Sequence, residues 1–304
     1  MHDRYIVAHE VAATSTSQVL LCTERLTGHH VIVKRIQVQF LAGVDASKMS
    51  LERQIHRRLS ANGGHRHILT LLDDFSADGF DTLVLEYCGR GDLFTLVENA
   101  PDRRLAPPLV QASFAGICDA VHFMHMNGVA HGDLSLENVL VTDSGTLKLS
   151  DFGLATPIDT IHRNQHVAGK AFYMAPEMHV AHGTNDPAKA DVWSLGVMLF
   201  MLVTGTPPFE TSHASDSSMQ FVATKGCRAL CAAWHLDDVI PADAMDLLEN
   251  MLVIDPAERW TIQDVVNHAY VRHNPLAHDM LALHPDLELR AAQPAAVPLL
   301  QLAH

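Results

Sequence analysis

The sequence predicts an α+β protein in which a smaller strand-rich part precedes a larger helical part. Two observations carry this prediction. Short segments rich in valine and isoleucine, separated by polar or glycine-containing turns, fill the chain up to about residue 87. Long apolar or amphipathic segments follow from about residue 91. We place the junction between the two parts near Glu86, Tyr87 and Cys88.

The strand-rich part is expected to contain strands and one helix. Five segments have the length and β-branched content of strands: 5–12, 18–24, 29–38, 67–75 and 81–87. Between the third and the fourth, residues 46–59 follow a helical pattern in which Met49, Leu51, Ile55 and Leu59 form a partial apolar stripe. Glycines at 63 and 64 end this helix.

The second part is expected to be mainly helical. Helical patterns cover the segments 109–128, 191–205, 244–253 and 261–271. The last of them begins with Thr261 and carries Asp264 three residues later, close to a capping box. Residues 138–152 predict a hairpin over an Asp-Ser-Gly turn. From about residue 274 the chain is rich in Ala, Leu and Pro, and we expect a C-terminal tail without a core of its own over 274–304.

Composition and charge limit the classes of partner. Hydrophobic residues make up 48% of the chain and charged residues 18%, as in an ordinary soluble globular protein. A net charge of −14 without a dense basic run predicts no binding to nucleic acid or to an anionic membrane, and favours basic peptides. The longest apolar stretch, 192–203, is too short to span a bilayer and predicts a buried helix.

The cysteines point to a reducing compartment. The five cysteines are odd in number and scattered, which argues against a disulfide framework, and the N-terminus lacks a signal-peptide pattern. We therefore expect a cytoplasmic protein. Cys227 and Cys231 have helical spacing and are expected to pack in the interior rather than bind a metal. The sequence leaves the oligomeric state open.

Residues that can carry chemistry occur in a fixed order along the chain. Lys34 ends the strand VIVK, Asp133 and Asn138 stand five residues apart in HGDLSLEN, and Asp151 opens DFG after a strand. In this order they match the protein kinase signature set, and the chain resembles a protein kinase over about residues 5–273. Further matches are APE at 175–177, DVWSLGV at 191–197 and DPAERW at 255–260.

The resemblance implies a bilobal protein kinase fold over residues 1–273. The N-lobe would cover about 1–86, the hinge 87–92 and the C-lobe 93–273. DLSLEN is closer to the DLKPEN of serine/threonine kinases than to the DLAARN of tyrosine kinases. The helical part is similar to that of the calcium/calmodulin-dependent type, so a serine/threonine kinase is expected.

The resemblance also implies the catalytic roles, with ATP and Mg²⁺ as cofactors. Lys34 would supply positive charge to the α and β phosphates, steered by a helix carboxylate for which Glu52 is the candidate. A solvated helix charge is the alternative for Glu52. Asp151 and Asn138 would bind Mg²⁺, and Asp133 would accept the proton of the substrate hydroxyl.

The nucleotide contacts are assigned in the same way. Leu85 would guard the back of the adenine pocket, the backbone from Glu86 to Cys88 would bind the base, and Asp92 would meet the ribose. The other positions assigned to the nucleotide are Ala12, Val19, Ile32 and Leu140.

Four matched residues belong to the architecture instead. His131 and Phe152 are expected to pack beneath the site as buried spacers. Glu177 and Arg259 resemble the buried ion pair of the family, whose loss would damage the fold without touching the chemistry.

The phosphate loop departs from the family pattern. Ala12, Thr14 and Ser17 stand where the family has glycines, which lack a Cβ and let backbone N–H groups approach phosphates. We expect ATP to bind about tenfold to a hundredfold more weakly for this reason. Ile32 replaces a small alanine and narrows the roof over adenine.

The catalytic loop departs as well. Gly132 replaces the arginine that receives an activation-segment phosphate, so activity should depend only weakly on phosphorylation of Thr156 or Thr160. Ser135 replaces the lysine that steadies the migrating phosphoryl group. Lys170, at a position where the family has threonine, either returns that charge from the opposite side or faces solvent.

Two functions remain after this comparison of residues. The first is an active protein serine/threonine kinase, and the second is a pseudokinase that acts as a scaffold or nucleotide-sensing partner. A small-molecule phosphotransferase is a weaker third.

Asp92 and Glu137 match acidic positions that meet arginine upstream of the acceptor, while Met201 replaces a further glutamate. The expected partner is a protein substrate with a partial preference for basic residues.

Overall fold

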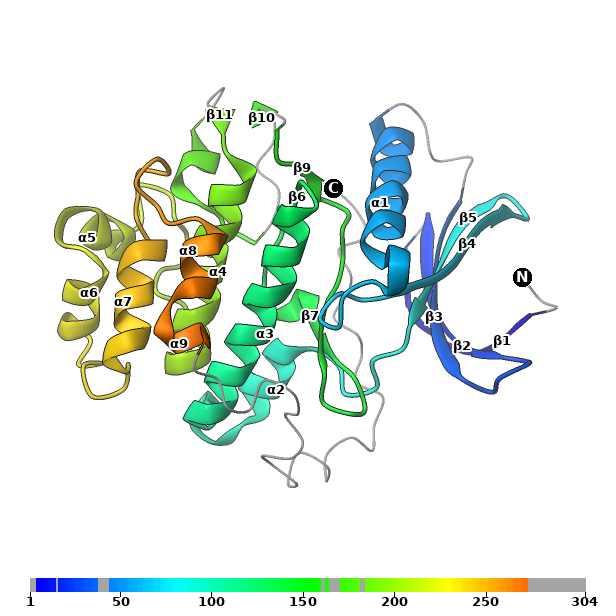
Figure 1. Cartoon of the computed structure of the whole chain (residues 1–304), viewed down its shortest axis with the longest axis horizontal. Helices are drawn as coiled ribbons and strands as arrows, with labels where there is room; N and C mark the ends of the chain where they lie inside the picture. The colour runs from blue at the N-terminus through cyan, green and yellow to red at the C-terminus, as the bar shows by residue number, and fades with distance from the viewer. Residues whose placement is uncertain are drawn as a thin grey trace.

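The computed structural model describes residues 4–14, 16–37, 44–159, 162–163, 170–180 and 184–272. The expected tail from residue 274 lies outside these residues. The described chain forms two lobes, a sheet with one long helix and a larger helical lobe, as Figure 1 shows. The α+β architecture expected from the sequence is therefore confirmed.

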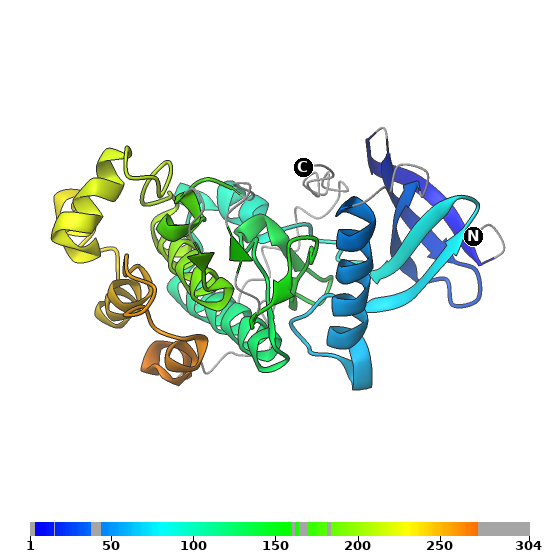
Figure 2. The ribbon, with the colours of Figure 1, turned by 90° about the horizontal axis from the view of Figure 1, so that it is seen from above.

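The N-lobe contains one antiparallel sheet of five strands in the order β1-β2-β3-β5-β4. The strands are β1 (Tyr5–Ala13), β2 (Ser17–Glu24), β3 (His30–Gln37), β4 (Leu71–Ala77) and β5 (Phe80–Glu86). Helix α1 (Val44–Ser60) and the 3₁₀ turn η2 (Ala61–Gly63) stand between β3 and β4 in the sequence. Figures 1 and 2 both place α1 between the sheet and the helical lobe.

Alternation along β3 separates the core of the N-lobe from its cleft. Val31 and Val33 are buried in a small cluster with Leu20 of β2 and Val84 of β5. Side chains two residues apart lie on the same face of a strand, so Ile32 and Lys34 share the opposite face. That face is the one turned toward α1 and the cleft.

The C-lobe is built from eight helices within the described part of the chain. They are α2 (Leu93–Asn99), α3 (Pro107–Met126), α4 (Pro187–Thr204), α5 (Ser217–Lys225), α6 (Cys227–Ala233), α7 (Ala242–Met251), α8 (Ile262–Asn267) and α9 (Ala269–Arg272). Short 3₁₀ turns add η3 (Pro101–Arg103), η4 (Leu136–Asn138) and η5 (Pro176–His179). The lobe has one continuous hydrophobic core.

Helix α4 is the centre of that core. It packs against α3 and α7, and 89% of its span is buried inside the protein, although its length and hydropathy would also suit a membrane span. The expectation of a buried helix at 192–203 is confirmed. Its ends follow from the sequence: Asp186 caps the first amides, Pro187 stands at N1, and Gly205 ends the helix with a φ of +80°.

Short strand pairs also occur in the C-lobe, and the β7–β8 pair contributes to the cleft. β7 (Val139–Val141) pairs with β8 (Leu147–Leu149), which is the hairpin predicted over 138–152. β6 (Val129–Ala130) pairs with β9 (Thr156–Pro157), and β10 (His162–Arg163) pairs with β11 (Thr184–Asn185). β5 ends at Glu86 and α2 begins at Leu93, so residues 87–92 link the two lobes.

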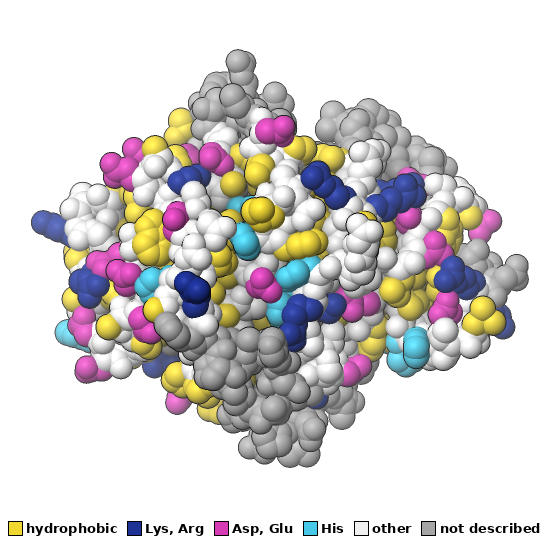
Figure 3. All heavy atoms as spheres, viewed as in Figure 1, with side chains coloured by type: hydrophobic (Ala, Val, Ile, Leu, Met, Phe, Trp, Pro, Cys, Tyr) yellow, Lys and Arg dark blue, Asp and Glu magenta, His cyan; other side chains and the backbone are white. Residues whose placement is uncertain are grey.

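The surface mixes both signs of charge. On the face in Figure 3, acidic, basic and hydrophobic side chains are interspersed over both lobes.

The N-terminus of α8 is capped as the sequence indicates. Thr261 and Asp264 form its capping box, with the carboxylate accepting from the Thr261 amide at 2.9 Å.

Candidate active site

A cleft of about 620 Å³ lies between the two lobes. Its walls come from β3, α1, the linker and the β7–β8 hairpin, which are far apart in the sequence. The cleft is lined by Ile32, Lys34, Glu52, His56, Leu69, Leu85, Glu86, Tyr87, Cys88, Gly91, Leu140, Ser150, Asp151 and Phe152. Ile32, expected to narrow the roof over adenine, is among these lining residues.

Lys34 carries the positive charge of this cleft. Its Nζ lies 2.8 Å from Glu52 Oε1 on α1 and 3.9 Å from Asp151 Oδ1. Burial alone would lower the pKa of Lys34, but the carboxylates of Glu52 and Asp151 raise it above its ordinary value. Lys34 is therefore a fixed cation, and Glu52 is its buried partner rather than a solvated helix charge.

Asp191, on α4, fixes the loop that carries Asp133. Its two carboxylate oxygens accept from the backbone amides of His131 at 2.8 Å and Gly132 at 2.9 Å. Its Oδ2 also lies 2.8 Å from Nε2 of His125. Gly132 has a φ of +76°, a region where side chains are strained. The motif DVWSLGV does not reveal this role of Asp191, since its partners lie about sixty residues away in the sequence.

Asp133 and Asn138 meet as their spacing indicated. Asn138 Nδ2 donates to Asp133 O at 2.8 Å and to Asp133 Oδ2 at 3.0 Å. Burial raises the pKa of Asp133, which His131, Lys170 and Asn138 partly offset and Asp151 raises further. The amide nitrogen of Asn138 is committed to Asp133, which leaves its carbonyl oxygen as the atom that can face a cation.

Asp151 and Phe152, which are adjacent in the sequence, both line the cleft. Asp151 has a φ of +62°, an unusual conformation for a residue other than glycine, and such residues cluster at functional sites. Phe152 is buried against the rings of His56, at a centroid distance of 4.8 Å, and His131, at 5.6 Å. His131 Nε2 also lies 3.0 Å from Ser150 O. His131 and Phe152 thus pack beneath the site, as expected.

The family follows from a comparison of the whole chain. Residues 5–271 match the sequence model of the protein kinase domain. This chain belongs to the protein kinase family. The bilobal kinase fold expected from the motifs is thereby shown, and protein kinase domains in general use ATP with Mg²⁺.

Three relatives illustrate the type of kinase. The human NUAK family SNF1-like kinase 1 is 30% identical over 271 residues, covering 89% of this chain and 39% of the relative. Fission yeast (Schizosaccharomyces pombe) serine/threonine-protein kinase chk1 is 29% identical over 274 residues, covering 88% of this chain and 53% of the relative. The Aurora kinase of the same yeast is 28% identical over 256 residues, covering 84% and 67%. This kinase chain thus spans about two fifths of the first relative's length and half of the second's.

Lys170, which follows the catalytic loop in the sequence, contacts two residues of that loop. Ser135 is fully buried, and its Oγ accepts from Lys170 Nζ at 2.9 Å. Lys170 Nζ also lies 3.0 Å from Glu137 Oε1. Of the two alternatives for Lys170, the structure shows an ion-paired side chain that turns toward the catalytic loop rather than one extended into solvent.

The phosphate loop of the kinase is folded on itself through Thr14. Thr14 Oγ1 accepts from the amides of Ser17 at 3.1 Å and Thr16 at 3.3 Å, and it lies 2.7 Å from Ser17 Oγ. These amides are donors that a phosphate would otherwise use. Ala12 pairs with Val19 at the base of this hairpin, and Val19 pairs with Lys34. The sequence indicates crowding of the phosphate loop, whereas its internal hydrogen bonds are visible only in the structure.

The structure gives Asp92 a task that differs from the expected ribose contact. Its carboxylate caps α2, accepting from Thr95 N and Thr95 Oγ1, both at 2.8 Å. The side chain is fully buried and is absent from the cleft lining. A cap satisfies amides that have no helical partner, which explains why an aspartate stands here. Leu85, Glu86, Cys88 and Leu140 do line the cleft, as assigned.

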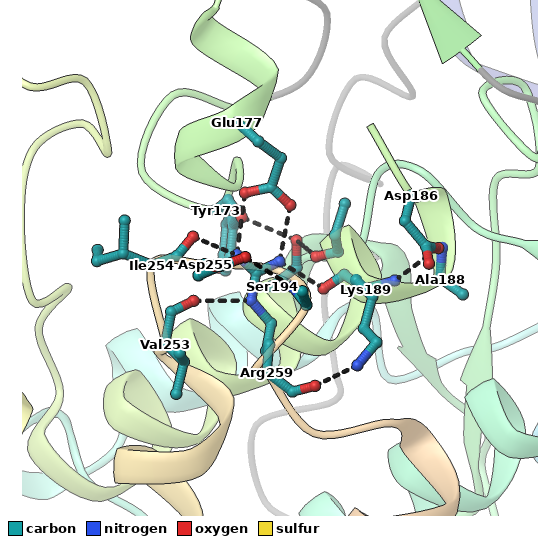
Figure 4. A network of polar contacts seen from close by, with 12 residues as sticks. Tyr173, Glu177, Asp186, Ala188, Lys189, Ser194, Val253, Ile254, Asp255 and Arg259 are labelled. Carbon is teal, nitrogen blue, oxygen red and sulfur yellow. Dashed lines mark hydrogen bonds and ion pairs between the residues drawn. The ribbon is translucent and has the colours of Figure 1, made fainter. Parts of the chain in front are cut away.

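Glu177 and Arg259 form the buried pair that the motifs indicated (Figure 4). Arg259 Nη1 lies 2.8 Å from Glu177 Oε1, and Nη2 lies 2.9 Å from Oε2. The remaining guanidinium donors reach the carbonyls of Val253, Lys189 and Ile254. The pair is complete in its hydrogen bonds and links the end of the activation segment to the α7–α8 connection.

Proposed function

We propose that this chain is an active protein serine/threonine kinase that transfers the γ-phosphoryl group of ATP to a hydroxyl of a protein substrate. The observation that carries the proposal is a set of contacts: Lys34 is paired with Glu52 and lies near Asp151 in the cleft, and Asp133, hydrogen-bonded to Asn138, is close enough to Asp151 to be affected by its charge. The named serine/threonine kinases among the relatives support the substrate class. A pseudokinase that serves as a scaffold is the alternative.

In the proposed reaction each of these residues has a task. Lys34 binds the α and β phosphates, and Glu52 fixes its direction. Asp133 orients the substrate hydroxyl and accepts its proton. Leu85 and the backbone of Glu86 to Cys88 bind the adenine.

The oxygens of Asp151 and Asn138 suit Mg²⁺. Among the described residues, no cluster of three or more His, Cys, Asp or Glu forms an all-protein metal site. Magnesium in kinases is held by one or two protein oxygens together with substrate phosphates, so this sparse set fits. When bound, Mg²⁺ neutralises charge on the β- and γ-phosphates. Asp151 and the Asn138 carbonyl oxygen are the groups that would hold it.

Lys170 supplies the missing charge of the catalytic loop. A lysine two residues after the catalytic aspartate is replaced by Ser135, and Lys170 bonds that serine hydroxyl. We propose that its ammonium stabilises the migrating phosphoryl group from the activation segment. Because Gly132 cannot receive an activation-segment phosphate, activity depends only weakly on phosphorylation of that segment.

The five cysteines support a reducing, cytoplasmic location. All five are buried and unpaired in the structure. Burial raises the pKa of Cys88 and Cys118 and so keeps them as inert thiols.

A phosphotransfer assay tests the proposal. The wild-type chain with radiolabelled ATP and Mg²⁺ should label a mixture of protein substrates. Asp133→Asn and Asp151→Asn should each reduce the rate by about a hundredfold or more. Wild-type activity that both variants retain would contradict the assignment. No labelling by the wild type, together with a thermal shift by Mg-ATP, would establish the pseudokinase alternative.

A further inference from the structure

Glu137, the acidic residue nearest to Asp133 along the catalytic loop, has both of its oxygens engaged. It lies on η4, four residues after Asp133. Lys170 Nζ is 3.0 Å from Oε1, and the Tyr173 hydroxyl donates to Oε2 at 3.1 Å. Burial, with a contribution from Glu137, raises the pKa of Tyr173 well above its ordinary value, so this hydroxyl stays protonated and keeps donating.

This pair lies where a substrate must pass. The acceptor hydroxyl has to reach Asp133, and Asp133, Lys170 and Tyr173 line one recess together with residues of α4. Lys170 also acts electrostatically on Asp133, lowering its pKa. A peptide bound along this seam therefore meets the Lys170 ammonium and a carboxylate that is already neutralised.

A basic side chain of the substrate would have no free carboxylate at this position. To reach Glu137, an arginine would have to displace Lys170 and then lie beside a second cation, which would keep the Ser135 hydroxyl as its hydrogen-bond partner. Like charges brought together in a partly buried site disfavour binding. Asp92, the other acidic group expected to attract arginine, is fully buried as the cap of α2.

We propose that Lys170 is a built-in counter-ion of Glu137, so that this kinase phosphorylates serine or threonine in sequences that need no arginine or lysine upstream of the acceptor. The inference rests on the proposed kinase activity, and it identifies Lys170 as a specificity-determining residue. For the individual positions of the substrate, this inference replaces the expected partial preference for basic residues. The net charge of −14 still attracts basic proteins at long range, but it does not select a residue.

Matched peptides test the proposal. Each carries one serine in a neutral frame, with either Arg or Ala at one of the five upstream positions, and the ratio of kcat/KM for the two is measured at about 150 mM salt. The wild type should show ratios within about twofold of one, and Glu137→Gln should leave them unchanged. Lys170→Met should raise the ratio to about tenfold or more at one position.

In the double variant Lys170→Met/Glu137→Gln, the Arg/Ala ratio of kcat/KM should return to the wild-type value. This would show that the arginine preference of Lys170→Met comes from the carboxylate of Glu137. Each ratio is taken within one enzyme, so a loss of overall rate in Lys170→Met does not affect it. If that variant is too slow, the same ratio is read from the dissociation constants of the two peptides by fluorescence anisotropy. A wild-type arginine preference of about tenfold at any position overturns the inference. If the wild type phosphorylates no peptide or protein, the proposed function fails with it.

Discussion

The two unusual residues beside Asp133 contact each other. Ser135 stands where a lysine is expected, and the Nζ of Lys170 lies 2.9 Å from its hydroxyl oxygen. Both side chains are in a partly buried site, where a preorganised charge has more effect than in water. This arrangement moves the cation from the rigid catalytic loop to the activation segment. Turnover should then depend on how that segment is docked.

Replacing Lys170 by methionine should therefore lower kcat and also change its pH dependence. We expect kcat to fall about a hundredfold, with little change in the KM for ATP. Asp133 must be ionised to accept a proton, so activity is lost as the pH falls through its pKa. Lys170 lowers that pKa, and its removal should move the acid limb of the kcat profile to higher pH. Lys170→Arg should keep most of the charge effect. An unchanged rate with an unchanged acid limb would show that Lys170 has no part in the reaction.

Thr14 should weaken the binding of phosphate, because its hydroxyl accepts hydrogen bonds from backbone amides that a phosphate would otherwise use. Thr14→Gly should free the amides of Thr16 and Ser17 for the phosphates. We expect the KM for ATP to fall about threefold to tenfold, since each neutral hydrogen bond contributes about 0.5–1.5 kcal/mol. Thr16→Ala is the matched control, because it leaves the Thr14 hydroxyl in place. A KM that stays constant or rises in Thr14→Gly would contradict this account.

The motif residues were located by their match to the protein kinase pattern, in which residue type and order along the chain identify them. Asp133 and Asn138 are five residues apart and meet within one loop, and Lys34 lies within β3, whose alternation turns it to the cleft. The tasks of Asp92 and Asp191 were missed, since an aspartate can cap a helix, bind a ribose or anchor a loop. Only the three-dimensional neighbours decide between these.

At the scale of elements, α1 is held in its place by ion pairs beside Glu52. Arg53, the next residue, lies 3.2 Å from Asp74 and 2.9 Å from Asp81, which are on β4 and β5. Arg57, one turn later, lies 2.6 Å from Asp74. These contacts fix α1 against the sheet from its outer side, while Lys34 binds Glu52 from the cleft.

Asp74→Asn should loosen α1 and weaken the Lys34–Glu52 contact. We expect kcat/KM for ATP to fall about twofold to tenfold, a moderate effect because Arg57 is more than half exposed and its pair is screened by solvent. The exposed pair of Arg228 and Glu249 provides the control, and Glu249→Gln should leave ATP kinetics unchanged. Equal effects of the two variants would remove the special role of the Arg53 and Arg57 contacts.

Some helices could be predicted from their sequence, and others could not. The helix expected at 46–59 is α1, and the capping box expected at Thr261 is present, because amphipathic spacing and cap residues act locally. The helices α2, α5 and α6 have seven to nine residues and were missed. Helices this short are not stable by themselves, so packing against the rest of the lobe forms them.

At the scale of the whole molecule, the Glu177–Arg259 pair joins segments that are eighty-two residues apart. The Arg259 side chain is fully buried, and its guanidinium also lies over the Trp193 ring of α4 at 5.2 Å. Glu177→Gln leaves a buried cation without its counter-ion, and we expect the free energy of unfolding to fall by about 3–5 kcal/mol. Thermal melting measures this loss, and the KM for ATP of the folded variant at low temperature should be unaffected. A melting temperature equal to that of the wild type would contradict it.

The cleft draws its walls from both lobes, so a bound nucleotide must also link them. Ile32 and Lys34 come from the sheet, whereas Leu140 and Asp151 come from the helical lobe. A ligand that binds only the folded chain stabilises it by about 2.7 kcal/mol at a hundred times its dissociation constant, which corresponds to a rise in melting temperature of roughly 5–10 °C. Mg-ATP should give this rise, and Asp151→Asn should remove the part that depends on Mg²⁺, as seen by comparison with EDTA. Thr14→Gly should enlarge the rise at subsaturating ATP, because freed amides would strengthen binding. A rise of equal size with and without Mg²⁺ in the wild type would mean that Asp151 and Asn138 hold no metal, and the phosphates would then be neutralised by Lys34 alone.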